Sequence, residues 1–290
     1  MGMFLGLLTA LTWGGADFIA RFSTHRMGTL RTMLYMQSTG FLLLSIALPW
    51  FGGLGHLSDG SGWQPWAWGL LAGGLNAFGS LALYRAFEVG KMAVVAPLSA
   101  SYPALTLVLS WLSGQNLSAE RVAGILLILF GVVIVAGSEK APDLNGAGTV
   151  PGGGKAIALA ICAATGFGLL FWLLGTRIIS RVGAVPTVWM IRMTSSLVSI
   201  AVIFFFRQPA RLPRGNVGAM ALSMGAMDTI AFILSNRAMQ MEQVAVISVL
   251  GSLYGAVTVG LAAIFLREHV SRWQWLGIAS VFSGIFLISR

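Results

Sequence analysis

The chain has 290 residues, of which 57% are hydrophobic and 9% are charged, and its formal net charge is +9. Soluble domains carry roughly 25% charged residues, so a chain this apolar could not cover a water-exposed surface. The basic residues are scattered through short segments between apolar runs, which argues against nucleic acid as a partner and for a lipid bilayer as the solvent.

Ten apolar runs follow one another along the chain, each close to the roughly 20 residues that a helix needs to cross the hydrocarbon core. The first run has neither a basic stretch before it nor a small-residue cleavage site after it, which predicts a retained helix rather than a cleaved signal. The predicted helices cover residues 3–20, 32–51, 66–87, 92–113, 120–137, 155–174, 186–206, 216–238, 244–266 and 273–289.

The longest polar stretch, residues 138–154, is rich in Gly and falls at the midpoint of the chain. It predicts a linker between a first unit over residues 1–137 and a second unit over residues 155–290, which together form one membrane domain. Lys and Arg concentrate in the segments that follow the odd-numbered helices, which favours an orientation with both termini outside the cytoplasm.

The two halves resemble each other in sequence. Because each half has five predicted spans, an odd number, the second half must enter the membrane from the opposite side. The expected fold class is therefore all-α integral membrane, with ten transmembrane helices arranged as two inverted five-helix repeats, an architecture typical of alternating-access transporters. The residues that match at a nearly constant spacing include Arg85-Ala86 with Arg237-Ala238, Tyr102 with Tyr254, Thr106 with Thr258, Gly124 with Gly277, and Gly131 with Gly284.

Ionisable residues within a membrane span are costly and are therefore candidates for function. Arg192 and Asp228 are the strongly ionised residues that lie well inside predicted spans, at places that correspond to Gln37 and Asn76 in the first half. In one interpretation, Arg192 binds a substrate carboxylate while Asp228 binds an amine or a proton. In the other, the two residues pair with each other as a structural unit. Asp17 is expected to form an interfacial pair with a basic residue four positions later, Arg21.

Aromatic and small polar side chains form a second group of candidates. Trp13, Tyr102 and Tyr254 are interpreted as an aromatic wall for an apolar or cationic substrate, or alternatively as packing aromatics. Pro97 and Pro103 interrupt one predicted helix, and such breaks often line transporter cavities. The predicted substrate-binding set is Trp13, Asn76, Ser99, Tyr102, Arg192, Asp228, Ser252 and Tyr254.

Catalytic and cofactor motifs are not found in the sequence. The segment Gly152-Gly153-Gly154-Lys155 looks like a phosphate-binding loop, but Thr149 and Ala156 stand where that motif requires Gly and Ser or Thr. The three histidines lie outside the apolar runs, and neither Asp17 nor Asp228 has the preceding Gly of a membrane aspartyl protease. We therefore expect no enzyme activity, no cofactor and no bound metal.

Several short motifs, in this order, resemble those of the drug/metabolite transporter superfamily, in particular its ten-helix EamA-type branch and the YddG-like amino-acid exporters within it. The motifs are Trp13-Gly14, Tyr84-Arg85-Ala86-Phe87, Asn236-Arg237-Ala238-Met239, and Leu266-Arg267-Glu268-His269 followed by Gly277. The first half departs from the pattern, with Gln115-Asn116 in place of a Glu. The resemblance implies secondary export of small metabolites such as amino acids through a central cavity.

We therefore expect a multi-pass transporter of a bacterial inner membrane that exports small organic metabolites, with aromatic or apolar amino acids as the first candidates. Its expected partners are a small-molecule substrate, the lipid bilayer and, as a candidate coupling ion, protons carried by Asp228. No nucleic acid partner is expected, and a monomer suffices. The alternatives are an exporter of cationic drugs, of nucleotides or of sugars, and a membrane interaction protein that transports nothing.

Overall fold

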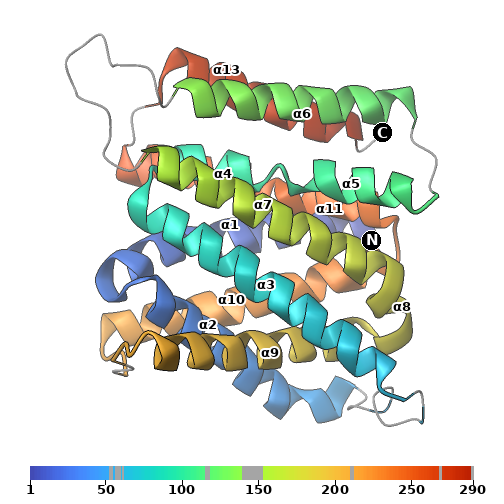
Figure 1. Ribbon diagram of the computed structural model, residues 1–290, viewed down its shortest axis with the longest axis vertical. Helices are drawn as coiled ribbons and strands as arrows, with labels where there is room; N and C mark the ends of the chain where they lie inside the picture. The colour runs from blue at the N-terminus through green and yellow to red at the C-terminus, as the bar shows by residue number, and fades with distance from the viewer. Residues whose placement is uncertain are drawn as a thin grey trace.

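The structure is a computed structural model that describes residues 1–51, 55, 60, 62–114, 118–138, 153–209, 212–267 and 270–288. The described elements are all helices (Figure 1). Those of the first half are α1 (Gly2–Met27), α2 (Thr29–Ala47), η1 (Leu48–Phe51), α3 (Gln64–Val89), α4 (Met92–Ser99), α5 (Tyr102–Leu112) and α6 (Ala119–Ser138). Those of the second half are α7 (Gly153–Leu173), η3 (Leu174–Ile178), α8 (Ile179–Val182), α9 (Ala184–Phe205), α10 (Asn216–Met239), α11 (Val244–Ser252), α12 (Tyr254–Leu261), η4 (Ala262–Leu266) and α13 (Arg272–Ile288).

Helices occupy each of the ranges that the apolar runs predict. Seven helical segments of the described chain are long and apolar enough to cross a membrane, and α3, α6 and α13 are not among these seven. The protein is therefore a helical multi-pass membrane protein. Most of the predicted linker, residues 139–152, lies outside the described residues.

Two glycines mark helix ends that lie later in the chain than the hydrophobic pattern predicts. Gly28 has φ 81° and ψ 159°, and Gly183 has φ 88° and ψ 165°. This conformation is essentially restricted to glycine, because a Cβ atom would clash with the backbone. Each glycine lets the chain reverse within one residue, from α1 into α2 and from α8 into α9. Consequently α1 continues to Met27, several residues past its predicted end.

The predicted helices over residues 92–113 and 244–266 are each divided into two, and in both cases the second helix begins with a tyrosine. Pro103 has no N–H to bond to the preceding turn, and α4 ends at Ser99 while α5 begins at Tyr102. In the second half α11 ends at Ser252 and α12 begins at Tyr254 without a proline. The Ser252 hydroxyl donates to the carbonyl of Val249 at 2.8 Å and so takes up a carbonyl in the last turn of α11.

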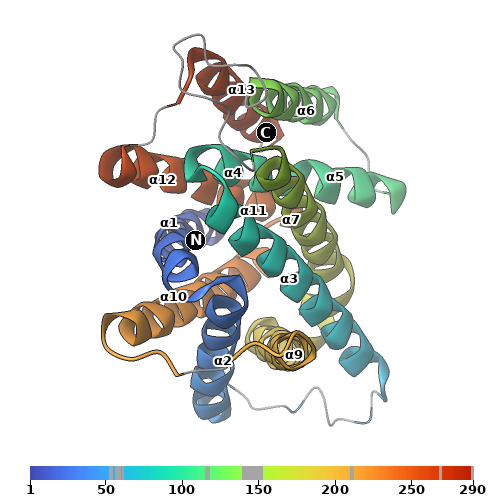
Figure 2. The same cartoon turned by 60° about the vertical axis from the view of Figure 1, so that its left-hand side comes forward.

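The helices are stacked in layers along the longest axis of the molecule (Figure 1). At one end α6 and α13 lie side by side and pack mainly on each other (Figure 2). The next layer holds α4, α5, α11 and α12, followed by α1 and α7, then α3 and α10, and finally α2 with α9. The helices around the middle of this stack come from both halves of the chain.

Contacts between the halves come in equivalent pairs. Helix α7 packs on α3, α4 and α5, and α1 packs on α10, α11 and α12. The Thr106 hydroxyl donates to the carbonyl of Gly168 at 3.1 Å, and the Thr258 hydroxyl donates to the carbonyl of Gly14 at 3.5 Å. Close packing at Gly73 against Thr194 is repeated at Gly225 against Thr39. Each half therefore presents the same kind of surface to the other.

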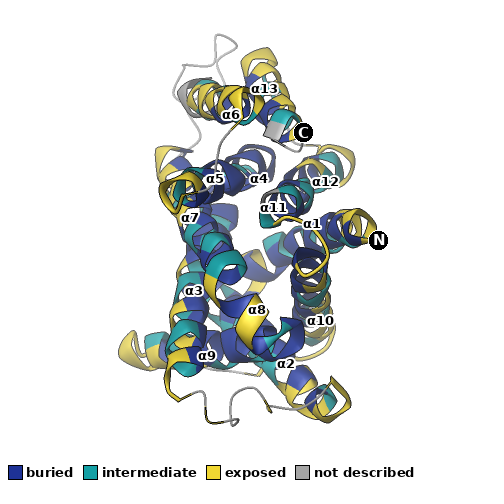
Figure 3. Ribbon diagram, turned by 90° about the vertical axis from the view of Figure 1, so that its right-hand side faces the viewer, coloured by how far each residue is buried: buried dark blue, intermediate teal, exposed yellow. Residues whose placement is uncertain are grey.

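Exposed residues lie on the outer faces of the helices and buried residues lie between the helices (Figure 3). Large apolar side chains such as Leu42, Phe204 and Ile264 are exposed on the outer faces, where lipid tails would cover them. Polar side chains such as Gln37 and Asn76 are buried between the helices. Because buried polar groups in lipid need partners inside the protein, they concentrate where the helices cross.

Candidate functional site

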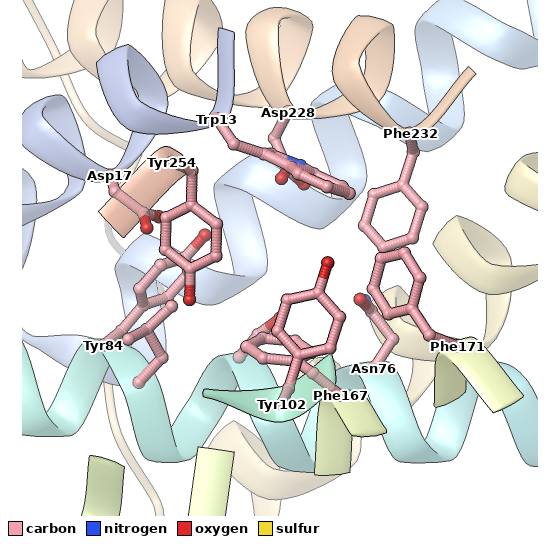
Figure 4. Close-up of a pocket in the computed structure, with 12 residues that line it drawn as sticks. Trp13, Asp17, Asn76, Tyr84, Tyr102, Phe167, Phe171, Asp228, Phe232 and Tyr254 are labelled. Atoms are coloured by element: carbon pink, nitrogen blue, oxygen red, sulfur yellow. The ribbon is translucent and has the colours of Figure 1, made fainter. Parts of the chain in front are cut away.

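A cavity lies in the middle of the molecule, where helices of both halves cross (Figure 4). Six helices contribute to it: α1, α3 and α5 from the first half, and α7, α10 and α12 from the second. Its lining residues are Trp13, Asp17, Asn76, Ser80, Leu83, Tyr84, Tyr102, Phe167, Phe171, Asp228, Phe232 and Tyr254.

The cavity is small in this conformation, at about 40 Å³. A water molecule needs roughly 10–15 Å³ of such space, whereas sites for small organic ligands usually measure about 300–1,000 Å³. The cavity as it stands has room for a few water molecules. An organic solute could enter only if the surrounding helices moved apart.

One end of the cavity is polar. There Asp17 of α1 lies near the phenol groups of Tyr84 and Tyr254 (Figure 4). The Tyr84 hydroxyl contacts the Met36 sulfur at 3.3 Å, and the Tyr254 hydroxyl donates to or accepts from the Ser99 hydroxyl at 2.9 Å. Both phenols are therefore held by groups other than the carboxylate.

Asp17 is 7% exposed and, within the described residues, has no hydrogen bond or ion pair. The predicted interfacial pair with Arg21 is wrong. The Arg21 guanidinium instead donates to the backbone carbonyls of Phe87 and Gly90, the latter at 2.8 Å. It thereby ties the end of α1 to the end of α3 and leaves the carboxylate of Asp17 facing the cavity.

The other end of the cavity is aromatic. Trp13 makes edge-to-face contacts with Phe171 and Phe232, with ring centroids 5.8 and 5.2 Å apart. Tyr102 stacks on Phe171 at 4.7 Å, and Tyr254 lies edge-on to Trp13 at 6.4 Å. Such contacts fix the rings in place and present an apolar, polarisable surface to the cavity.

Arg192 and Asp228 form an ion pair at the edge of the cavity. The Arg192 guanidinium also donates to the side-chain carbonyl of Gln37 at 2.7 Å and lies 5.1 Å from the ring centroid of Phe232. Arg192 is completely buried, whereas Asp228 is 8% exposed and lines the cavity. Of the two roles predicted for this pair, the structure has the mutual pairing, and the guanidinium does not reach the cavity.

The family model of the EamA-like transporter family matches residues 1–137 and again residues 154–290. The chain belongs to the EamA-like transporter family. Its members are transporters of small molecules in membranes, which agrees with the exposed apolar faces and with the polar, partly aromatic cavity between the halves.

Two known proteins are similar to this EamA-like transporter. An uncharacterised protein of Methanocaldococcus jannaschii is 29% identical over 133 residues, which are 46% of this chain and 93% of that protein. The archaeal protein is thus about half as long as this chain. A solved crystal structure, 20% identical, matches with a TM-score of 0.70 and covers 99% of this chain and 95% of its own. At that identity the likeness shows the fold alone.

The cavity of this EamA-like transporter includes five of the eight side chains predicted to bind substrate: Trp13, Asn76, Tyr102, Asp228 and Tyr254. The remaining three, Ser99, Ser252 and Arg192, are fully buried and lie outside the lining, and their role in substrate binding stays a prediction. The Ser99 hydroxyl bonds to the Ala96 carbonyl and to Tyr254, so it supports a lining residue from behind.

Two lining residues of the first half, Asn76 and Tyr102, are held by groups of the second half. The Asn76 amide donates to the Ser195 hydroxyl at 3.0 Å, and this hydroxyl donates to the carbonyl of Gly73. The Tyr102 hydroxyl donates to the carbonyl of Ser248 at 2.9 Å, across the boundary between the halves. Movement of one half against the other would have to break or carry along these bonds.

Sequence reasoning missed seven lining residues of this transporter. For Phe167, Phe171, Phe232 and Leu83 the sequence holds no local signal, because they are ordinary apolar residues in apolar helices. The structure aligns α7 with α1, since the hydrogen bonds from Thr106 to Gly168 and from Thr258 to Gly14 place Phe167 at the position of Trp13. The other three missed residues are Asp17, Ser80 and Tyr84.

Proposed function

We propose that this protein is a secondary transporter that exports small organic solutes across a bacterial inner membrane by alternating access, with the central cavity as its binding site. In this proposal all ten helical segments cross the membrane, and the two halves form an inverted repeat. The cavity is exposed alternately on the two sides as the halves rock against each other.

The paired contacts between the halves support the repeat. The hydrogen bonds from Thr106 to Gly168 and from Thr258 to Gly14 join equivalent helices in opposite order. The same family model matches each half separately, and the archaeal relative is about as long as one half. A unit of this kind that occurs twice in one chain can form two similar bundles around a shared site.

The observation that carries the proposal is the small central cavity between these halves. It is lined by both halves, contains a carboxylate without a partner in the described residues, and is too small for an organic solute. A preformed pocket for an organic ligand usually measures about 300–1,000 Å³. A transporter that alternates between two sides passes through an occluded state, in which its site must open before a ligand can enter.

The substrate class and the energy source are part of the proposal. Apolar and aromatic amino acids, which the sequence resemblance implies, enter the tests below together with amines, sugars and nucleosides. Asp17 is a better candidate than Asp228 for a residue that carries a proton, because the Arg192 guanidinium already pairs with Asp228. Transport without any coupling ion is the other outcome that the assay distinguishes.

Access to the cavity can be tested without knowing the substrate. Ser80 lines the cavity, and the native Cys162 is exposed and can be replaced. In a Cys162→Ala background, we expect Ser80→Cys to react with a membrane-impermeant maleimide added to either side of sealed vesicles. Ser235→Cys is the control, because Ser235 is fully buried on α10 outside the lining.

Reaction of Ser80→Cys from one side only, under every condition, would contradict alternating access. Vesicles that also leak a small inert dye would indicate a pore instead. Transport itself is measured by loading proteoliposomes with a defined mixture of amino acids, amines, sugars and nucleosides and following their release by mass spectrometry, with and without a pH gradient. No release of any solute would overturn the proposed function for these classes.

A further inference from the structure

We propose that the cavity selects organic monocations, namely amines with an aromatic or apolar group and no carboxylate, and that Asp17 is the residue that recognises the ammonium group. This inference rests on the proposed function and names the substrate class of the same cavity. It departs from the amino-acid substrates that the sequence resemblance implies.

The first argument is the state of Asp17. The residue is 7% exposed and lines the cavity, and within the described part of the chain it has neither an ion pair nor a hydrogen bond. An isolated carboxylate in such a place is costly unless it is neutralised or paired. An ammonium group supplies both the opposite charge and the hydrogen-bond donors that the carboxylate lacks.

The second argument is the aromatic surroundings of this carboxylate. Tyr84 and Tyr254 lie at the same end of the cavity as Asp17, and Trp13 lies between this end and the phenylalanines (Figure 4). Aromatic faces attract cations, by about 0.5–2 kcal/mol each depending on desolvation. A carboxylate with several rings around it is the combination that binds alkylammonium and arylalkylammonium groups.

The shape of the lining also defines the rest of the ligand. At the end opposite Asp17, Phe171 and Phe232 present ring surfaces, with the Asn76 amide beside Phe171 (Figure 4). A ligand with its ammonium group on Asp17 would therefore extend an aromatic or branched apolar group toward these two rings. The cavity thus has the unpaired carboxylate of Asp17 at one end and mostly aromatic rings at the other.

The third argument is the lack of a site for a substrate carboxylate. None of the lining residues that the structure describes is Lys, Arg or His. Arg192 is fully buried behind Phe232, and two of its donor groups are already used by Asp228 and Gln37. A carboxylate on the ligand would face Asp17 and Asp228 without a free cation to balance it.

The helix breaks beside the cavity do not replace the missing cation. Helix N-termini can bind anions through unbonded N–H groups. At the start of α5, Pro103 has no N–H, and the N–H of Ala104 donates to the Ser101 carbonyl. At the start of α12, the N–H groups of Ala256 and Val257 both donate to the carbonyl of Leu253. Zwitterionic amino acids would therefore bind poorly.

A matched ligand series tests this directly on the purified full chain in lipid nanodiscs. Phenethylamine and phenylalaninamide are cations, phenylalanine is a zwitterion, and 3-phenylpropionate is an anion, while all four share the same phenylalkyl group. Binding is measured by titration calorimetry. We expect the two cations to bind at least about 30-fold more tightly than phenylalanine and the anion, the effect of one unpaired charge in a desolvated site.

Variants then assign the recognition to Asp17. We expect Asp17→Asn to weaken phenethylamine binding by about 30-fold or more and Asp17→Glu to restore much of it. Glu120→Gln is the matched control, because it removes a carboxylate from an exposed position at the start of α6. It should leave the affinity unchanged.

Three results would overturn the inference: phenylalanine binding as tightly as phenethylamine, unchanged amine binding by folded Asp17→Asn, or no binding of either cation. The ligand series on the unmodified protein remains decisive even if Asp17→Asn does not fold. If Ser80→Cys reacts from both sides while neither cation binds, the transporter proposal stands and the amine assignment falls.

Discussion

The two sides of the cavity have the same framework and different chemistry. The hydrogen bonds of Thr106 and Thr258 align Gly14 of α1 with Gly168 of α7. The same alignment places Trp13 at the position of Phe167 and Asp17 at the position of Phe171, and all four side chains line the cavity. The first half thus contributes a carboxylate where the second half contributes a phenyl ring.

Helices α3 and α10 repeat this contrast. The contacts of Gly73 with Thr194 and of Gly225 with Thr39 align the two helices, so that Ser80 corresponds to Phe232. Asn76 corresponds to Asp228. The neutral Asn76 amide donates to Ser195, whereas the Asp228 carboxylate forms an ion pair with Arg192. A nearly symmetric scaffold can therefore support a rocking motion while its lining distinguishes the two ends of a ligand.

The charged pair provides the strongest test of this difference. Replacing Arg192 with Met leaves Asp228 buried without its partner, and we expect a loss of about 3–5 kcal/mol in the free energy of unfolding. The neutral counterpart, Asn76→Leu, removes one hydrogen bond and should cost only about 0.6–1.7 kcal/mol. Thermal unfolding in detergent, followed by tryptophan fluorescence, measures both.

The double variant Arg192→Met with Asp228→Asn is the control for the charged pair. Because it removes both charges together, it should recover most of the stability lost in Arg192→Met. If Arg192→Met costs no more than Asn76→Leu, the ion pair is not the structural unit inferred here.

Helices α6 and α13 contact each other through equivalent glycines, so we expect equivalent substitutions in the two helices to have equal effects, unlike in the cavity. A Cβ atom on Gly131 would lie 2.5 Å from the carbonyl oxygen of Gly277, and a Cβ atom on Gly284 would lie 2.5 Å from that of Gly124. Backbone atoms cannot move aside as a flexible side chain can. Gly131→Ala and Gly284→Ala should therefore each lower the free energy of unfolding by about 1–3 kcal/mol, and by nearly equal amounts. Unfolding in detergent measures the two losses.

Gly74→Ala is the matched control, because no atom lies within 4 Å of the Cβ atom it would add on α3. It should be neutral or slightly stabilising, by up to about 1 kcal/mol, through the better helix propensity of alanine. A large difference between Gly131→Ala and Gly284→Ala would mean that the two helices are not equivalent partners.

Most of the helices and part of the cavity could be predicted from the sequence, because both follow from patterns that a single chain carries. Apolar runs fix the helices, and costly residues such as Asn76 and Asp228 stand out against an apolar background. The tyrosines that begin α5 and α12 were found because they match between the halves. Glycine conformations such as that of Gly28 decide the helix ends and leave no trace in hydrophobicity.

The rest of the cavity depends on competition between partners, which sequence spacing does not resolve. Asp17 and Arg21 have the spacing of a helical ion pair, but the carbonyls at the end of α3 bind the guanidinium instead. The position of Arg192 behind Phe232 likewise depends on three helices meeting. The phenylalanines of α7 are recognised as lining residues only in the folded structure, where the hydrogen bonds of Thr106 and Thr258 align α7 with α1.

Protons and amines compete for the Asp17 carboxylate, which distinguishes this end of the cavity from the aromatic end. Protonation neutralises the Asp17 carboxylate, so amine binding should weaken as the pH falls, by up to about tenfold per pH unit where this carboxylate titrates. The other charged and titratable groups around it are Asp228 with its partner Arg192, Tyr84 and Tyr254. Phenols ordinarily titrate only near pH 10.

Calorimetric titration with phenethylamine between about pH 5 and pH 8 measures this dependence. Asp17→Asn is the control, and its residual binding should not change over this range. An equal pH dependence in both proteins would assign the proton to another group, with Asp228 the next candidate.

The smallest expected effect tests whether the halves are held together equivalently. Thr106→Val and Thr258→Val keep the side-chain shape and remove the hydroxyl that bonds to the opposite half, so each should cost about 0.6 kcal/mol and at most about 1.7 kcal/mol. The loss should be larger for Thr106, whose bond to Gly168 measures 3.1 Å, than for Thr258, whose bond to Gly14 measures 3.5 Å and is weaker. Unfolding in detergent gives the two losses, and Ser80→Cys labelling of the same variants gives the effect on access to the cavity. A greater effect of Thr258→Val on labelling, despite its smaller cost in stability, would identify the contact of α1 with α12 as the one that opens first.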